Sequence, residues 1–174
     1  MAMTVSPIAN YHEDPRYWKT LSELSEAKSK DRCITPDSAA GRIMAFGLDE
    51  IKLDRCRNYG YPRGGLSSDA FWLQNGAPVL VEFKTSSVGD AELFRTIYDS
   101  VILLAELGVM SWTESRDTLE FILVQKDVEK YITGDYEGNP DRDARVLESQ
   151  VVKSVRRMSP EEFESYVSER GWAS

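Results

Sequence analysis

The Asn-Gly pair at positions 75 and 76 is the feature that most constrains the fold of this chain. It separates two apolar segments, DAFWLQ at 69–74 and APVLVEFKT at 77–85. Asn-Gly is the preferred centre of a tight type I′ turn, so the two segments are predicted to form a β-hairpin. If Asn75 and Gly76 are the two turn residues, Gln74 pairs with Ala77 and Asp69 lies opposite Glu82.

This register is expected to gather three polar side chains on one face of the hairpin. Counted outward from the turn, Asp69 and Glu82 form a non-hydrogen-bonded pair, in which the Cα atoms are only about 4.5 Å apart. Lys84 is two residues beyond Glu82 and therefore points to the same face. The remaining residues of both faces are apolar: Phe71, Leu73, Pro78 and Leu80 on the shared face, and Trp72, Val79, Val81 and Phe83 on the other. Helices are therefore expected to cover both faces.

Two carboxylates that face each other in apolar surroundings persist only if one is protonated or if cations lie between them. Lys84 supplies one positive charge. A hard divalent ion, Mg²⁺ or Mn²⁺, would supply the rest, with Asp69 and Glu82 as ligands and the Phe83 carbonyl as a further one. The alternative is an ordinary half-buried salt bridge at the end of a hairpin, because an Asp followed by Glu-x-Lys is a common spacing.

Hydrophobic periodicity and turn residues outline the other elements. They predict helices over 16–30, 36–44, 91–107 and 160–170, strands over 50–56, 118–125 and 144–152, and loops over 58–68 and 134–143. The last helix is marked by a capping box, Ser159-Pro160-Glu161-Glu162. This order predicts a single α/β domain over residues 1–174, with a mixed central sheet flanked by helices.

The residue inventory excludes several kinds of catalysis. His12 is the only histidine, and it stands near the N-terminus, so a serine–histidine or cysteine–histidine hydrolase is not expected. Cys33 and Cys56 are too few for a zinc site or a disulfide framework and are expected to be reduced. Catalysis would therefore depend on carboxylates, lysine and a metal.

Charge and hydropathy limit the partners and the location. The formal net charge is −8, and the acidic excess falls in the second half of the chain. Such acidity opposes non-specific coating of nucleic acid, although an enzyme with a local positive patch remains compatible with it. The chain shows no apolar run of membrane-helix length and no secretory signal pattern, so a cytoplasmic protein without a membrane partner is expected.

The segment SSDAFWLQNGAPVLVEFKTS resembles the core motif of the PD-(D/E)XK nuclease superfamily, in which an Asp is followed by Glu-x-Lys on the next strand. The likeness covers about residues 16–125 and leaves 144–174 as a C-terminal strand and helix extension. It implies a restriction-endonuclease-like core of order αβββαβ, with Asp69 and Glu82 as Mg²⁺ ligands. It also implies that Lys84 orients or activates the attacking water.

Two further details belong to this resemblance. The superfamily often adds a glutamate from the first helix, and Glu23 is preferred here over Glu26. Ser68 stands where the written motif has proline. The later segment IYDSVILLAELG is similar to a group of small bacterial proteins that carry the same Glu-Phe-Lys strand.

A basic and aromatic segment at 52–65 precedes the hairpin. Arg55, Arg57 and Arg63, interleaved with Tyr59 and Tyr61, are candidates for contacts with phosphates and bases. The alternative is a solvated loop with two anchoring tyrosines. Other polar groups considered for the site are Gln125 and Lys126 at the end of the strand at 118–125, and Asp54 as a substitute for Glu23.

The leading hypothesis is a metal-dependent phosphodiester hydrolase, a nuclease or nuclease-like protein that acts on DNA or RNA with Mg²⁺ or Mn²⁺. The alternative is a catalytically inactive protein of the same fold that binds a protein partner as an adaptor or immunity factor. A third possibility is another α/β protein with an incidental hairpin salt bridge. The sequence gives no indication of the oligomeric state.

Overall fold

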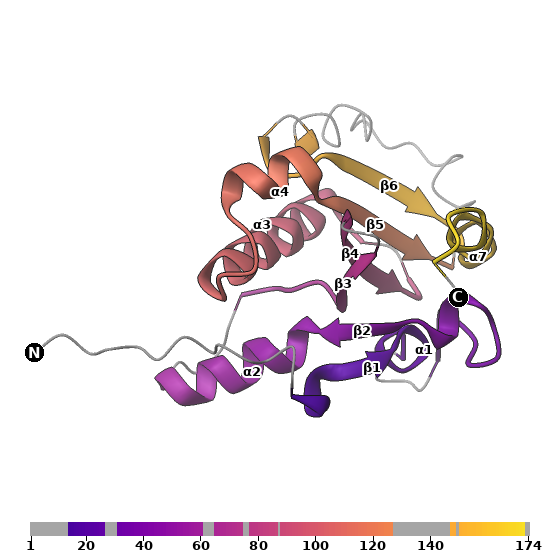
Figure 1. The fold of residues 1–174 in the computed structure, drawn as a ribbon, viewed down its shortest axis with the longest axis horizontal. Coiled ribbons are helices and arrows are strands. Elements are labelled where there is room, and N and C mark those ends of the chain that lie inside the picture. Colours follow the sequence, from indigo (N-terminus) through magenta and orange to yellow (C-terminus); the bar gives the residue numbers. More distant parts are fainter. Residues whose placement is uncertain are drawn as a thin grey trace, which may run out of the picture.

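The structure is a computed structural model that describes residues 14–26, 31–60, 65–74, 77–86, 88–126, 147–148 and 150–172. These residues form an open six-stranded mixed sheet (Figure 1). The strands, in spatial as well as chain order, are β1 (Trp18–Thr20), β2 (Met44–Gly47), β3 (Ala70–Gln74), β4 (Ala77–Lys84), β5 (Glu120–Gln125) and β6 (Ser154–Met158). Strands β1 to β4 pair with one another in antiparallel fashion, whereas the pairs β4–β5 and β5–β6 are parallel. The predicted α/β class with a mixed sheet is confirmed.

Helices cover both faces of this sheet. The helical elements are η2 (Pro15–Tyr17), α1 (Leu21–Leu24), η3 (Ala40–Arg42), α2 (Leu48–Tyr59), α3 (Asp90–Glu106), α4 (Trp112–Thr118) and α7 (Pro160–Glu169). Side chains of α2 and α3 join one hydrophobic cluster, and side chains of α1 and α7 join the other. Within the described residues, no helix combines the length and apolar character needed to cross a membrane.

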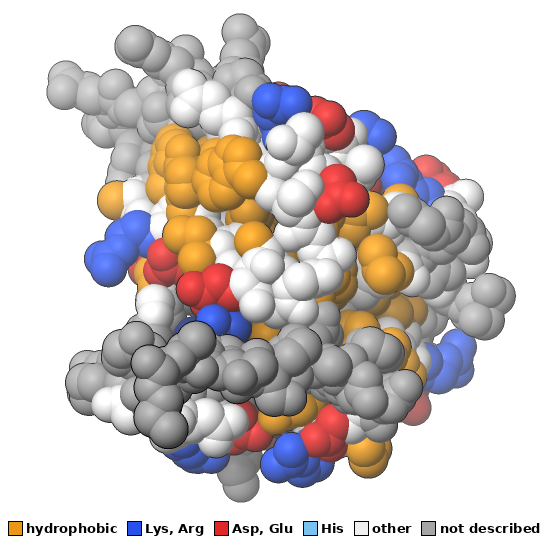
Figure 2. Space-filling model, turned by 60° about the vertical axis from the view of Figure 1, so that its left-hand side comes forward, with side chains coloured by type: hydrophobic (Ala, Val, Ile, Leu, Met, Phe, Trp, Pro, Cys, Tyr) orange, Lys and Arg blue, Asp and Glu red, His pale blue; other side chains and the backbone are white. Residues whose placement is uncertain are grey.

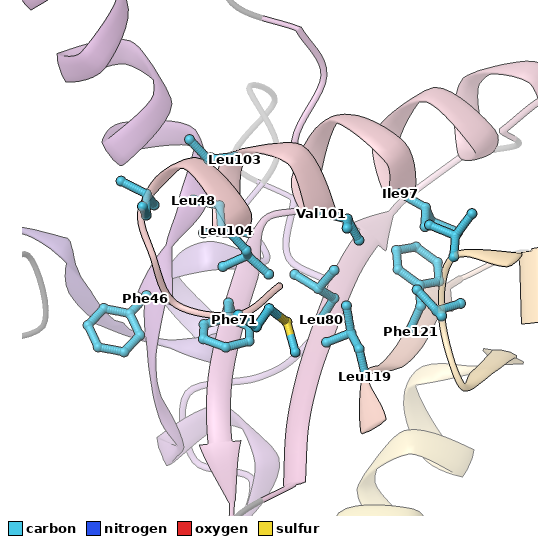
Figure 3. Close-up of a cluster of buried hydrophobic side chains, with 14 of the residues drawn as sticks. Phe46, Leu48, Phe71, Leu80, Ile97, Val101, Leu103, Leu104, Leu119 and Phe121 are labelled. Carbon is cyan, nitrogen blue, oxygen red and sulfur yellow. The ribbon is translucent and has the colours of Figure 1, made fainter. Parts of the chain in front are cut away.

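The hairpin register agrees with the prediction from the Asn-Gly pair. Gln74 lies opposite Ala77, and Ala70 lies opposite Val81 at the far end of the ladder. Phe71 and Leu80 belong to the cluster beneath α2 and α3 (Figure 3). The cluster on the opposite face contains the four residues predicted for it: Trp72, Val79, Val81 and Phe83. The hairpin is therefore covered on both faces.

The crossover from β4 to β5 passes through α3, which the sequence predicted to within a residue or two. Ile97, Val101 and Leu104 of α3 lie over Leu80 of β4 and Phe121 of β5 in the close-up of the core (Figure 3). Every residue of β5 is buried, as expected for a central parallel strand. The final helix α7 is also confirmed, including its capping box between Ser159 and Glu162.

The strand predicted over 50–56 is wrong, because this segment belongs to the helix α2. Leu48 and Ile51 are buried at helical spacing, whereas Leu53 is 48% exposed, so the apparent alternation of apolar residues did not mark a sheet face. Asp49 and Glu50 lie in the first turn, and Gly60 ends the helix in the left-handed conformation with φ 70°. Acidic residues at the start and a glycine stop are ordinary helix signals.

Within residues 14–26, the helix predicted over 16–30 is reduced to one short α-helix, α1, preceded by strand β1, while residues 27–30 lie outside the described part of the chain. Thr20 and Glu23 form a capping box, so the helix begins at Leu21, and the residues before it pair with β2. The short helix predicted over 36–44 is also wrong in extent, since only η3 is helical and Met44 starts β2.

The C-terminal strand is displaced from its predicted place. Residues 147, 148 and 150 are helical, and the strand β6 follows at Ser154–Met158. Two consecutive residues of this edge strand, Arg156 and Arg157, are charged and exposed. The sequence of β6 therefore lacks the alternation of apolar and polar residues that would predict a strand. Helix α4 was not predicted, and the predicted loop at 134–143 lies outside the described residues.

Candidate active site

The candidate site begins where the ladder between β3 and β4 ends. Ala70 and Val81 form the last pair, and the next hydrogen-bonded pair would join Ser68 to Phe83. Instead, the Ser68 N–H donates to Ser100 Oγ at 2.8 Å, and the Phe83 N–H donates to Asp69 Oδ2 at 2.7 Å. The Asp69 carboxylate thus takes the place of a backbone acceptor and is held at the end of the strand.

The same departure from the ladder affects the Phe83 carbonyl. The N–H and C=O of one strand residue point to the same side, so this carbonyl is directed toward Asp69. Its ladder donor would be the Ser68 N–H, which is bonded to Ser100. The Phe83 carbonyl is thereby separated from its expected ladder donor, and its role as a metal ligand stays a prediction.

Glu82 lies across from Asp69 and is almost completely buried, with 5% of its surface exposed. Its Oε1 atom is 2.9 Å from Lys84 Nζ. Its Oε2 atom is buried and has no hydrogen-bond partner among the described residues. A buried carboxylate oxygen without a partner is costly, so this atom is a position where a proton or a cation would be stabilised.

Burial and mutual repulsion shift the proton affinity of the two acids in the same direction. Desolvation, followed by the charge of Glu82, raises the pKa of Asp69 well above its usual range. Desolvation also raises the pKa of Glu82 to about 7, although Lys84 opposes this shift. One ammonium group is therefore insufficient to compensate both carboxylates, and the pair has a deficit of positive charge.

Lys84 is held between two carboxylates. Its Nζ atom is 2.9 Å from Glu82 Oε1 and 3.0 Å from Glu92 Oε1, which comes from α3. Burial lowers the pKa of Lys84, but Glu82 and then Glu92 outweigh this effect, so the net shift is upward. Lys84 is accordingly a permanent cation and hydrogen-bond donor at neutral pH rather than a base.

A pocket of about 180 Å³ opens at this end of β4. It is lined by residues from the α1 end, from the start of β3 and from the end of β4: Leu24, Ser25, Glu26, Asp69, Phe83, Lys84, Thr85 and Ser86. The glutamate that reaches the pocket from the first helix region is therefore Glu26. Glu23 instead accepts hydrogen bonds from the Thr20 N–H and Oγ1, both at 2.8 Å, so it caps its own helix.

The predicted nucleic-acid-binding residues lie on α2 or outside the described residues. Arg55 pairs with Glu106 of α3 at 2.8 Å, and Arg57 pairs with Asp54 at 3.1 Å. Tyr59 is the last residue of α2, while Tyr61 and Arg63 lie outside the described residues. The structure places Arg55 and Arg57 on a helix rather than a flexible loop, and their contact with nucleic acid stays a prediction.

The sequence reasoning missed Asp49, an acid at the start of α2. Asp49 adds its charge to the causes that raise the pKa of both Asp69 and Glu82. It accepts hydrogen bonds from Lys52 Nζ at 2.7 Å and from Ser67 Oγ. The acidic first turn and the glycine stop of α2 were the signals that could have placed it.

The donor set is compatible with a hard cation, but it is small. Within the described residues, no group of three or more His, Cys, Asp or Glu side chains has the geometry of a metal cluster. Asp69, Glu82 and the Phe83 carbonyl are the ligands predicted here from the sequence, and Mg²⁺ is commonly bound by one or two carboxylates together with waters and substrate oxygens. Comparisons with family models, curated proteins and solved structures found no match to this chain.

Proposed function

We propose that this chain is a metal-dependent phosphodiester hydrolase that cleaves DNA or RNA with Mg²⁺ or Mn²⁺ and has a restriction-endonuclease-like core. One observation carries the proposal. At the end of β4, Asp69 and Lys84 line a pocket, and Lys84 pairs with buried Glu82, whose Oε2 atom has no hydrogen-bond partner among the described residues.

The connectivity around the hairpin supports the nuclease-like core. β2, β3 and β4 form an antiparallel meander, and α3 then crosses to β5, which lies parallel beside β4. The order from α1 to β5 is α1, η3, β2, α2, β3, β4, α3, α4 and β5. Apart from the inserted helices α2 and α4 and the short helix η3, this is the order helix, three strands, helix and strand that the PD-(D/E)XK resemblance implies. A fold of this kind does not establish an activity, so the proposal depends on the chemistry of the site.

The metal fits the residues present because it would supply the positive charge that the site lacks. Asp69, Glu82 and the Phe83 carbonyl would hold it. Glu26 at the pocket wall would add a contact through water. When bound, such an ion polarises the phosphoryl oxygen and lowers the pKa of a water molecule.

The side chains have distinct proposed tasks in hydrolysis. Lys84 donates a hydrogen bond to the attacking water and stabilises negative charge that develops on the phosphoryl group. Glu82 and Glu92 keep the Lys84 ammonium beside the pocket. The water gives up a proton to solvent, and its oxygen forms a bond to phosphorus while the bond from phosphorus to the leaving ester oxygen breaks. The leaving oxygen then takes a proton from solvent.

The proposal is tested by calorimetric titration of Mn²⁺ into the wild type and into Glu82→Gln, followed by cleavage assays on plasmid and single-stranded substrates. Wild type is expected to bind Mn²⁺ and to cut. Glu82→Gln is expected to lose at least tenfold in Mn²⁺ affinity, because a neutral amide replaces a charged ligand. Asp117→Asn, at a side chain that is 56% exposed on α4, is the control and should bind as the wild type does. Absence of Mn²⁺ binding or of cleavage by the wild type would contradict the proposal.

A second prediction separates the two glutamates of the first helix region. Glu26→Gln is expected to weaken Mn²⁺ binding several-fold, because Glu26 lines the pocket. Glu23→Gln is expected to leave Mn²⁺ binding unchanged and to cost about 1 kcal/mol of folding stability, since Glu23 belongs to the capping box. Calorimetry and urea denaturation measure the two effects. The reverse pattern would restore Glu23 as the metal-site residue.

One surface feature favours the alternative, a protein-binding module. Ile102 and Trp112 are 46% and 40% exposed, and Trp112 contacts the ring of Tyr98. Figure 2 shows hydrophobic side chains gathered on one face of the molecule. Exposed aromatic and aliphatic groups are common at protein interfaces. Binding of Mn²⁺ without cleavage of any substrate would favour this alternative.

A further inference from the structure

Lys126 lies immediately beyond β5, beside the candidate active site. Its N–H donates to the Lys84 carbonyl at 3.1 Å, which places its backbone next to the end of β4. Its Nζ atom forms an ion pair with Asp31. Asp31 precedes Arg32. Arg32 contacts the pocket residue Glu26 in two ways, through an isolated β-bridge between the backbones and through a hydrogen bond between the side chains. The Lys126–Asp31 pair is therefore adjacent to two residues that line the pocket, since Lys126 bonds to Lys84 and Asp31 precedes the partner of Glu26.

Electrostatic effects on Cys33 also place Lys126 near the site. Burial raises the pKa of the Cys33 thiol to about 11, Lys126 lowers it, and Asp69 raises it. Both charges therefore act on the same buried thiol.

The charges around the pocket explain why a polyanion would need Lys126. Among the described residues, the charged groups that line the pocket are Glu26, Asp69 and Lys84. The ion-pair partners and charged neighbours of these groups add Glu82, Glu92 and Asp31 as acids and Arg32 and Lys126 as cations, which makes five carboxylates against three cations in the described part of the chain. One divalent ion would bring this group to neutrality but would leave no excess positive charge. A phosphate backbone that approaches the pocket is therefore repelled unless a cation exchanges its carboxylate partner for a phosphate oxygen.

Of the three described cations, Lys126 can make this exchange at the lowest cost in free energy. Lys84 forms ion pairs with two carboxylates, and Arg32 bonds to Glu26 through two of its nitrogens. Among the described residues, Lys126 pairs with one carboxylate, that of Asp31, which is 52% exposed. An ion pair this exposed contributes little to stability, because water and salt screen it.

We infer that Lys126 binds a backbone phosphate of the polynucleotide that enters the pocket, and that Asp31 holds Lys126 in the free protein and releases it on binding. The inference rests on the proposed function and assigns a substrate contact to the same site. Substitution of Lys126 is therefore expected to weaken substrate binding, whereas substitution of Asp31 is expected to strengthen it.

The test compares Lys126→Ala, Asp31→Asn and Lys153→Ala with the wild type on a labelled single-stranded oligonucleotide in Mn²⁺. Lys126→Ala is expected to raise KM about tenfold with little change in kcat, because it removes one charged hydrogen bond to the backbone. The plot of log affinity against log salt concentration has a negative slope, and the magnitude of this slope should decrease by about 0.7 in Lys126→Ala. Asp31→Asn should lower KM, since it frees Lys126. Lys153→Ala, at an exposed lysine beside β6, should leave both values unchanged.

Fluorescence anisotropy with the same oligonucleotide separates failure of the inference from failure of the proposed function. If the wild type binds the oligonucleotide without cutting it, and Lys126→Ala weakens this binding, the inference stands and the hydrolase proposal falls. If the wild type cuts while Lys126→Ala and Lys153→Ala have equal KM values and salt slopes, the inference falls alone. If the wild type neither binds nor cuts, both are overturned.

Discussion

Metal-free protein is expected to lose on the order of 3 kcal/mol of folding stability between pH 5 and pH 8, through Glu82 alone. The pKa of Glu82 is about 7 in the folded chain against an ordinary 4.5. Folded Glu82 therefore keeps its proton over a range where the unfolded chain has released it. The folded state binds more protons in this window, so the free energy of unfolding falls as the pH rises through it. Asp69, whose pKa is also raised, acts in the same direction.

A bound divalent ion should reverse this dependence. The ion competes with protons for the same carboxylates, and it binds the folded state more tightly as the pH rises. Mn²⁺ at saturating concentration is therefore expected to stabilise the protein strongly at pH 8 and weakly at pH 5.

Urea denaturation at pH 5, 6, 7 and 8, with a chelator and then with Mn²⁺, measures both effects. Glu82→Gln should reduce the loss of stability in the chelator and should reduce the stabilisation by Mn²⁺, because the amide does not titrate. Asp117→Asn, an exposed change on α4, controls for altered net charge. If the free energy of unfolding of the wild type stays constant or rises from pH 5 to pH 8 in the chelator, the raised pKa values of Glu82 and Asp69 are refuted.

Lys84→Met is expected to lower the rate of cleavage by about two orders of magnitude or more, the usual effect of removing one group that stabilises transition-state charge. It should also destabilise the metal-free protein at pH 8 by about 3–5 kcal/mol, because buried Glu82 loses its ion-pair partner. Single-turnover cleavage in Mn²⁺ and urea denaturation in the chelator measure these two losses.

The double variant Glu82→Gln with Lys84→Met separates stability from catalysis. It should regain most of the lost stability, since the buried Glu82 carboxylate that Lys84 compensates is no longer present, but it should remain inactive. Full activity of Lys84→Met in Mn²⁺ would remove Lys84 from the proposed mechanism. Equal stability of Lys84→Met and the wild type would show that Lys84 does not compensate Glu82.

The local sequence was sufficient to predict the hairpin and the long helix that follows it. The Asn-Gly pair sets the register through turn geometry, so the alignment of Ala70 with Val81 follows from short-range rules. The capping box of Ser159 and Glu162 likewise marked the start of α7 in the sequence. The capping box of Thr20 and Glu23 marks the start of α1 and was not recognised.

Helix α2 shows where such local reasoning failed. Its apolar residues alternate over a few positions as in a strand, but packing selected the helical spacing of Leu48 and Ile51 against the core. Short segments whose pattern fits both periods are decided by the neighbours they pack against. Asp49 and Arg55 consequently lie on a helix that the sequence reading did not contain.

The sequence by itself determined that Asp69, Glu82 and Lys84 share one end and one face of a hairpin, because turn type and strand alternation act over a few residues. Only the tertiary structure decided which groups join them. The Ser68 N–H bonds to Ser100 of α3 instead of to β4. Because α1 ends at Leu24, Glu26 lines the pocket, while Glu23 caps the helix. These contacts join residues distant in the chain, and their free energies depend on how the helices pack on the sheet.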